Sequence, residues 1–337
     1  MIATILIALV VAGGAAYWFK TQGPKVEAAS MDRMAFPLPD KPSIAVLPFT
    51  NMSGDPEQEY FADGMTEDLI TDLSKISGLF VIARNSTFSY KGKQVKVGQI
   101  AEELGVRYIL EGSVRRVGNQ VRINAQLIDA ISGGHLWAER YDGSLENVFE
   151  LQDEVTLSIV AALVVKLTTA EQELYVQHET DNPEAYDAFL RGWAYYQLQT
   201  PDNFTKAIPF FETAIELDPN FGRAHAALAA IYWGVWSNDW SKSMGIFYDD
   251  ALKKANRHLK EAMKNPTPLA HRISSSQHIV FQGLDEAMTE AERAIALDPN
   301  DPNGYAAMSK VLVRLDRAAE GLDFIKKVEA QLSMREY

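Results

Sequence analysis

The chain has 337 residues, enough for two domains, and 47% of them are hydrophobic, an ordinary proportion for a protein that buries a core. Its formal net charge of −13 argues against nucleic-acid binding, which calls for a basic surface. Because cysteine is absent, thiolate zinc sites, disulfides and cysteine nucleophiles are excluded.

The first apolar stretch, Ile2 to Phe19, predicts a membrane-spanning helix over residues 1–19. Its length meets the lower limit for crossing a bilayer, and its aromatic end suits the membrane interface. A cleaved signal peptide is the alternative, although no basic residue precedes the stretch. The nearest basic residues all follow it, at Lys20, Lys25 and Arg33, so the positive-inside rule alone would place the remaining chain in the cytoplasm.

Residues 20–41 predict a linker, because prolines are dense toward its end and favour an extended chain. From 42 to 143 the pattern alternates between strands and helices, which predicts an α/β domain. The pair Gly118-Asn119 indicates a hairpin turn between two of the strands. The expected strands are 44–49, 79–83, 106–117, 120–130 and 135–141, and the expected helices are 60–76 and 97–104.

The helix expected at 60–76 carries the carboxylates Asp63, Glu67, Asp68 and Asp72, which raises the question of an ion or phosphate site. Asp63 lies near the helix start, where the macrodipole favours negative charge. The other three fall off the apolar stripe of the helix. We therefore interpret the group as a solvated acidic face.

Catalytic motifs are missing elsewhere in the chain. The sequence has no Gly-rich phosphate loop followed by Lys-Ser/Thr, no His-Glu-x-x-His and no Gly-x-Ser-x-Gly. The six histidines are scattered. We expect no enzymatic activity, no metal site and no cofactor.

Several long phrases between Pro42 and Gly143 carry a resemblance: SIAVLPFTNMSGDPEQEYFADGMTEDLITDLSKI, LFVIARNSTF and IAEELGVRYILEGSVRRVGNQVRINAQLIDAISGGHLWAERYDG. They look like the TolB amino-terminal-like domain, which follows the transmembrane helix in many bacterial class III adenylate/guanylate cyclases and in CadC-like regulators. The resemblance implies a non-catalytic α/β domain that senses or binds. It also implies a place outside the cytoplasm, because a cyclase domain on the other side of the helix must meet ATP.

Residues 144–184 are expected to form an acidic helical connector, since nine carboxylates and one lysine lie between Gly143 and Glu184. Beyond it, AIELDPNF at Ala214 returns as AIALDPND at Ala294. Such repetition indicates tetratricopeptide repeats over residues 185–337, in which small residues let paired helices approach. Extra residues around 238–246 separate the two helices of the second repeat.

The first helices of such repeats line a concave face. Because aromatic and arginine side chains dominate interface energies, we expect a protein or peptide partner on this face. Burial between the repeats is the alternative for each of these residues. The residues that the helical register places there are Tyr186, Phe189, Trp193, Tyr196, Arg223, Trp233 and Arg272.

Two functions fit these patterns. The first is a membrane-anchored, non-enzymatic signalling or interaction protein with a sensing module and a tetratricopeptide scaffold. The second is the regulatory part of an adenylate/guanylate cyclase whose catalytic domain is missing or on a separate chain. We expect the bacterial inner membrane as the location, with the soluble part in the periplasm and the cytoplasm as the alternative.

Overall fold

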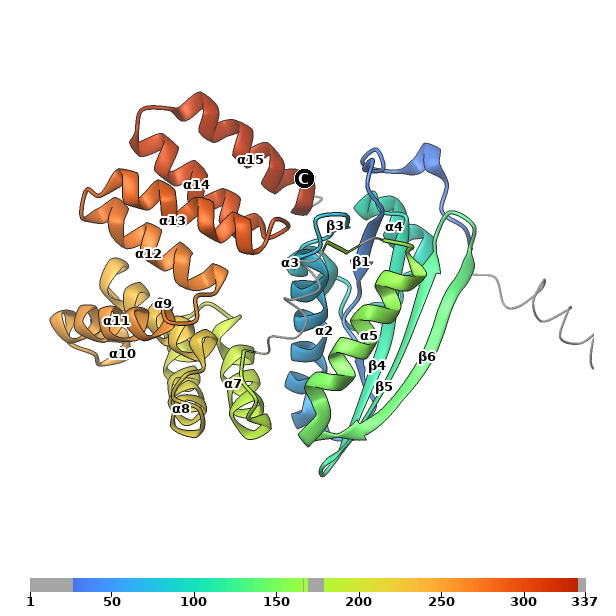
Figure 1. Cartoon of the computed structure of the whole chain (residues 1–337), viewed down its shortest axis with the longest axis horizontal. Helices are drawn as coiled ribbons and strands as arrows, with labels where there is room; N and C mark the ends of the chain where they lie inside the picture. Colours follow the sequence, from blue (N-terminus) through green and yellow to red (C-terminus); the bar gives the residue numbers. More distant parts are fainter. Residues whose placement is uncertain (1–26, 166, 169–178, 333–337) are drawn as a thin grey trace, which may run out of the picture.

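The computed structural model describes residues 27–165, 167–168 and 179–332, and it shows a mixed α/β part followed by a helical region (Figure 1). This confirms the expected order of the two fold classes. Within the described residues, no helix combines the length and the apolarity needed to cross a bilayer. The predicted membrane-spanning stretch, Ile2 to Phe19, lies outside the described residues.

The α/β part is built on one mixed sheet, with strand order β3-β1-β4-β5-β6 and a short β2 that also pairs with β4. β1 runs parallel to β3 and β4, whereas β4, β5 and β6 are antiparallel. All five expected strands are present. The bounds are β1 Ser43–Val46, β2 Thr50–Asn51, β3 Phe80–Val81, β4 Tyr108–Val117, β5 Gln120–Asp129 and β6 Gly134–Ser144.

Helices cover the two faces of this sheet unequally. α2 (Glu59–Ser74) and α5 (Val148–Ala162) pack on one face, where they share a core with the inward residues of β4, β5 and β6 (Figure 1). α4 (Val97–Leu104) packs on the opposite face beside β1 and β4. The short α3 (Arg84–Phe88) follows β3.

α5 is a layer of the α/β domain, whereas the sequence predicted only a connector at this place. Its buried residues recur at helical spacing, at Val148, Leu151, Val155 and Ile159. Glu150 and Glu154, two of the carboxylates that made this segment look solvated, lie on the exposed side of α5. They describe the outer face of the helix and not its packing.

The described end of the expected linker also packs on the domain. The Ala29 amide donates to the Ala130 carbonyl at 2.7 Å, and the Ala35 amide donates to the Glu102 carbonyl at 2.8 Å. The Arg33 guanidinium lies 2.7 Å from the Glu102 carboxylate. Between Ala29 and Ala35 the chain forms a single turn of 3-10 helix, Met31–Arg33, instead of an extended spacer.

The helical region consists of four successive helix pairs, and the extra residues of the second pair form a short additional helix, α10 (Figure 1). Small residues lie inside the pairs as predicted: Ala207, Ala214, Ala287 and Ala294 are fully buried. The pairs are α7 Pro183–Tyr196 with α8 Pro201–Leu217, α9 Gly222–Ser237 with α11 Tyr248–Ala262, α12 Pro268–Val280 with α13 Leu284–Leu297, and α14 Pro302–Arg314 with α15 Ala318–Leu332; α10 is Ser241–Met244.

Four helix starts in this region follow one local rule. Proline occupies the first turn of α7, α8, α12 and α14, where its missing amide hydrogen costs nothing. The residue before each proline caps the helix through its side-chain oxygen. These caps are Asn182, Thr200, Thr267 and Asp301.

Candidate functional site

Two adjacent carboxylates of α2 are buried at the boundary between the α/β domain and the helical region. Glu67 is 8% exposed and Asp68 is 9% exposed. The interpretation of these two residues as a solvated face is therefore wrong. The reason is that α2 packs on the sheet with one side and on α7 with another, so side chains off the apolar stripe are also covered.

The remaining acids of α2 are more accessible and paired locally. Asp63 is bonded by the Lys91 ammonium at 2.5 Å, and Asp72 pairs with Lys75 at 2.8 Å. Burial raises the pKa of Asp63, and the hydrogen bond and charge of Lys91 only partly oppose this rise. No group of three or more His, Asp or Glu in the described parts of the chain is arranged to hold a metal ion.

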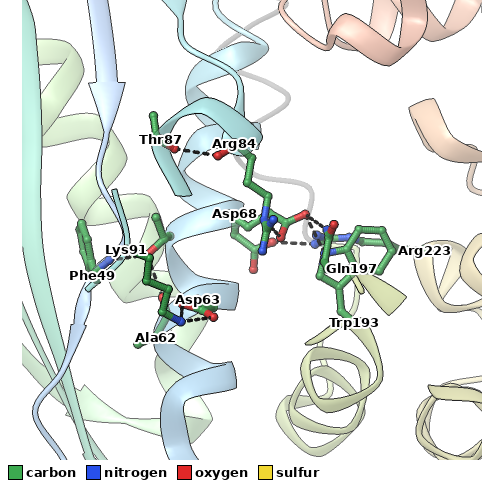
Figure 2. A network of polar contacts seen from close by, with 12 residues as sticks. Phe49, Ala62, Asp63, Asp68, Arg84, Thr87, Lys91, Trp193, Gln197 and Arg223 are labelled. Atoms are coloured by element: carbon green, nitrogen blue, oxygen red, sulfur yellow. Dashed lines mark hydrogen bonds and ion pairs between the residues drawn. The ribbon is translucent and has the colours of Figure 1, made fainter. Parts of the chain in front are cut away.

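Asp68 is the point where four helices meet. Its carboxylate accepts hydrogen bonds from the Tyr186 hydroxyl of α7, from Gln152 Nε2 of α5 at 3.2 Å and from Arg223 NH1 of α9 at 2.6 Å. Figure 2 shows Arg223 reaching this carboxylate from the helical region. A buried carboxylate that is fully bonded in this way fixes α2 against α5, α7 and α9 together.

Glu67 makes the second half of this contact. It accepts from the Trp193 indole at 2.6 Å and from Gln197 Nε2 at 2.9 Å, and on the other side from Arg84 Nε at 2.7 Å. Trp193 and Gln197 belong to the helical region, whereas Arg84 belongs to α3 of the α/β domain (Figure 2). The two adjacent carboxylates therefore bind both domains at once.

Electrostatics couple these groups strongly. Burial raises the pKa of Glu67, although Arg84 and Arg223 oppose the effect. Burial alone would lower the pKa of Arg223, but Asp68, Glu179 and Glu67 outweigh it and raise that pKa above its ordinary value. Burial and the Asp68 charge hold the pKa of Tyr186 well above 10. The guanidinium and the tyrosine hydroxyl therefore stay protonated throughout the physiological range.

A second contact holds α7 to the sheet. Asp187 accepts from the Tyr60 hydroxyl at 2.6 Å and from the Arg116 guanidinium, and Arg191 Nε donates to its other oxygen at 3.0 Å. Burial would raise the pKa of Asp187, but these hydrogen bonds and charges lower it. The carboxylate is therefore ionised and bridges α7 to α2 and β4.

A third contact lies at the far end of α2. Asn300 Nδ2, in the loop before α14, donates to the Ser74 carbonyl at 2.9 Å. Asp298 in the same loop is 7% exposed. Burial, reinforced by the neighbouring Asp301, raises the pKa of Asp298 to about 7.

Between these contacts a cleft of about 440 Å³ remains open. Tyr196, Arg84 and Arg272 are among its lining residues. Arg272 Nε has no hydrogen-bond partner among the described residues and lies 3.6 Å from the Asp301 carboxylate. The cleft brings side chains of the α/β domain and of the helical region to one surface.

The seven residues predicted to bind a partner lie in four different surroundings. Tyr186 and Phe189 are buried, and Trp193 and Arg223 bind the carboxylates of α2 within the chain. Tyr196 and Arg272 line the open cleft, which Trp193 and Arg223 also border. Trp233 is 7% exposed and stacks on Trp236. Contact of any of them with a separate protein stays a prediction.

Sequence reasoning missed several of the residues that bind the buried carboxylates of α2. Gln152, Gln197 and Arg84 carried no pattern that pointed to this contact. A signal did exist for Arg223, because it is the single charged residue in the otherwise apolar helix α9. A charge in such surroundings indicates a buried pair.

In the comparison with known families, the matched residues lie in the α/β part of the chain and its immediate continuation. Residues 40–171 match the family described as HilA/YgeH-like transcriptional regulator, second domain. The match runs past β6 and through α5, in agreement with α5 as a layer of this domain. It covers less than half of the chain.

A curated relative, "Putative adenylate cyclase 3" from Rhizobium meliloti (strain 1021), is 57% identical over 205 residues, which are 60% of this chain and 35% of the relative. The chain thus spans about a third of the length of that relative.

Two solved structures are weakly similar. TolB from Acinetobacter baumannii has 18% identity and a TM-score of 0.29, over 38% of this chain and 29% of TolB. Lipoprotein GNA1162 from Neisseria meningitidis has 19% identity and a TM-score of 0.27, over 36% of this chain and 98% of the lipoprotein.

Proposed function

We propose that this chain is the regulatory, non-catalytic part of a signalling protein whose output is nucleotide cyclisation. In this proposal the α/β domain senses a ligand or partner, and the helical region passes the change on. The observation that carries it is the pair Glu67 and Asp68, buried between the two parts and bonded by both. A change in either part that moves α2 must break or remake charged hydrogen bonds, so a signal received by one part would reach the other through this contact.

The names of the similar proteins support a regulatory role. One similarity is to a domain of a transcriptional regulator, and the other is to a protein named as an adenylate cyclase. Regulation of transcription and synthesis of cyclic AMP share no chemistry. An α/β domain found in both kinds of protein would therefore control the activity of another domain instead of carrying out either activity itself.

The helical region is proposed to be a tetratricopeptide scaffold that contacts a protein. The recurring LDPN phrases and the four helix pairs support this assignment. Tyr196 and Arg272 are the predicted partner residues that an incoming peptide would reach in the open cleft. Membrane anchoring through residues 1–19 and a periplasmic location stay predictions, which fusion of alkaline phosphatase or green fluorescent protein after Tyr337 would test.

To test this proposal, the segment of the curated relative that matches this chain is replaced by this chain. The hybrid protein is then produced in a bacterium that lacks its own adenylate cyclase, and cyclic AMP is measured. We expect the hybrid to make cyclic AMP, and Arg223→Ala to change its level at least about threefold, since the domain contact is broken. Arg122→Ala, which removes an exposed ion pair with Asp142, is the matched control and should leave the level unchanged.

The purified chain alone should make no cyclic AMP from ATP. Production above a blank, lost on Asp63→Asn or Asp68→Asn, would show that the chain is itself catalytic. A hybrid whose output ignores Arg223→Ala would reject the role of the domain contact. An inactive hybrid with a normal melting profile would favour an interaction protein with another output.

A further inference from the structure

The exposed aromatic side chains of the described structure gather in one place. Phe247 is 80% exposed, Phe281 is 57% exposed and Tyr248 is 45% exposed, and no other aromatic residue in the described parts of the chain belongs to the exposed class. Phe247 and Tyr248 lie at the start of α11, and Phe281 lies at the end of α12.

Trp236, near the end of α9, connects these side chains. Its ring centroid lies 5.4 Å from that of Tyr248 and 5.9 Å from that of Phe281. Trp233 stacks on it from below at 4.8 Å and is itself buried. We call Trp236, Tyr248 and Phe281, together with Phe247, which directly precedes Tyr248 in the chain, the aromatic patch. Contiguous exposed aromatic surface is characteristic of binding sites.

The surroundings of the aromatic patch are acidic. Residues 236–250 and 278–289 carry five carboxylates and one lysine, Lys242. Of these acids, Asp249 and Asp250 directly follow Tyr248, and Asp285 and Glu286 follow Phe281 in the first turn of α13. Asp250 has Lys253 at 3.8 Å, whereas no ion pair within the described residues involves Asp249, Asp285 or Glu286.

A similar combination of aromatic rings and carboxylates occurs at the domain boundary, where it binds an arginine. At the domain boundary the Arg223 guanidinium lies over the rings of Phe189, at 4.7 Å, and Trp193, at 5.3 Å, and the carboxylate of Asp68 binds it. Aromatic faces and carboxylates attract a cation jointly. The aromatic patch has both of these components, and the nearby lysines, Lys242 and Lys253, are outnumbered by the five acids.

We propose that the aromatic patch docks an arginine- or lysine-bearing segment of a partner protein, with the cationic side chains lying over Trp236, Tyr248 and Phe281 and their charges facing Asp249 and Asp285. The partner is basic because the two chain segments that carry the patch hold five carboxylates. A second copy of this chain is disfavoured there, since each copy carries a net charge of −13 and the patches repel one another. This surface is separate from the contact on which the proposed function depends.

The test measures fluorescence anisotropy of a labelled twelve-residue peptide that repeats Arg-Leu-Ala, titrated with the purified chain. The neutral counterpart repeats Gln-Leu-Ala. We expect the arginine peptide to bind and the glutamine peptide to bind at least about tenfold more weakly. Raising the salt concentration should weaken binding of the arginine peptide, because its charges are solvent-exposed.

Variants locate the site. Phe247→Ser and Phe281→Ser should each weaken binding about fivefold, and Asp249→Asn and Asp285→Asn about threefold. The matched controls are Leu322→Ser, an equally exposed apolar residue on α15, and Asp202→Asn, an exposed first-turn acid on α8. Unchanged melting temperatures show that the variants are folded.

Four outcomes would overturn the proposal: no binding of the arginine peptide, equal binding of the glutamine peptide, affinity that the patch variants leave unchanged, or a dimer of the chain that Phe281→Ser abolishes in sedimentation. None of them bears on cyclic AMP output in the hybrid protein, so the two proposals can fail separately.

Discussion

The domain boundary and the aromatic patch use the same side-chain types with opposite outcomes. At the boundary, Trp193 and Phe189 lie beside buried carboxylates, and Arg223 of the same chain completes the group. At the patch, Trp236 and Phe281 belong to chain segments with exposed carboxylates, and within the described residues no Arg or Lys lies over their rings. The difference teaches that one cluster is needed for stability, whereas the other is available for binding.

The largest effect should come from removing the cation at the boundary. Arg223→Ala leaves Asp68 buried without its charge partner, which we expect to lower the free energy of unfolding by about 3–5 kcal/mol. Urea denaturation followed by circular dichroism measures this. Arg122→Ala, at an exposed pair, should cost less than about 1 kcal/mol. Similar losses in the two variants would mean that the boundary is not a buried contact in solution.

Asp298 gives the boundary a dependence on pH. Its pKa is about 7 in the folded chain, above the ordinary value of 3.8, because burial and Asp301 disfavour its charge while Lys75 favours it only partly. Between pH 3.8 and about 7, Asp298 is therefore protonated in the folded state and ionised in the unfolded state. Stability from this group is complete below pH 3.8 and decreases as the pH rises to 7.

Asp298→Asn should remove the loss of stability that the ionisation of Asp298 causes as the pH rises. We expect the variant to be more stable than the natural chain by up to about 3 kcal/mol at pH 8 and no more stable at pH 4. Thermal melts across this range measure the effect. Asp218→Asn, at the equivalent place in the first LDPN phrase, is the control, and because Asp218 accepts from the Thr180 hydroxyl at 2.6 Å its replacement should not stabilise. A pH-independent gain for Asp298→Asn would contradict the assignment.

Replacing single tryptophans sharpens the comparison between the two clusters. Trp193→Phe keeps most of the ring but deprives buried Glu67 of an N–H donor, so we expect a loss of about 1–2 kcal/mol. Trp236→Phe should cost less, because no hydrogen bond of its indole occurs within the described residues. If peptide binding is lost in Trp193→Phe without any change in melting, Trp193 is a partner contact and not a structural one.

The smallest effect on stability is expected at the exposed end of the patch. Phe281→Ser removes a ring that is 57% exposed, so we expect a change of about 1 kcal/mol or less in the free energy of unfolding. The same purified protein should show the fivefold loss of peptide affinity described above. A large destabilisation would show that Phe281 belongs to the core and that its exposure has no role in binding.

Elements with a strong local pattern were predictable from the sequence. The helix at 97–104 has the predicted bounds, because apolar residues at helical spacing end at Gly105, which adopts the left-handed conformation there with φ of 64°. The strand at 120–129 was equally clear, since its apolar residues alternate with polar ones.

The burial of Glu67 and Asp68 was not predictable in the same way. Their partners Trp193 and Arg223 lie 126 and 155 positions away in the sequence. Local periodicity describes one buried face of a helix, so it assigns a second packed face to solvent. Only the lone arginine in apolar α9 hinted that a carboxylate elsewhere had to be buried with it.

The hydrogen bond from Asn300 to Ser74 closes a loop of 226 positions, and the bond from Tyr186 to Asp68 closes one of 118. Contacts this far apart in the chain form slowly, because the entropy of closing the loop opposes them. During synthesis α2 emerges well before α7 and α9, so we expect Glu67 and Asp68 to stay partly hydrated until the helical region packs against them. We expect the fluorescence of Trp193, in a variant that keeps this tryptophan alone, to lag behind the recovery of helical circular dichroism in refolding. The two carboxylates would then serve first as solubilising charges and only last as the contact that joins the domains.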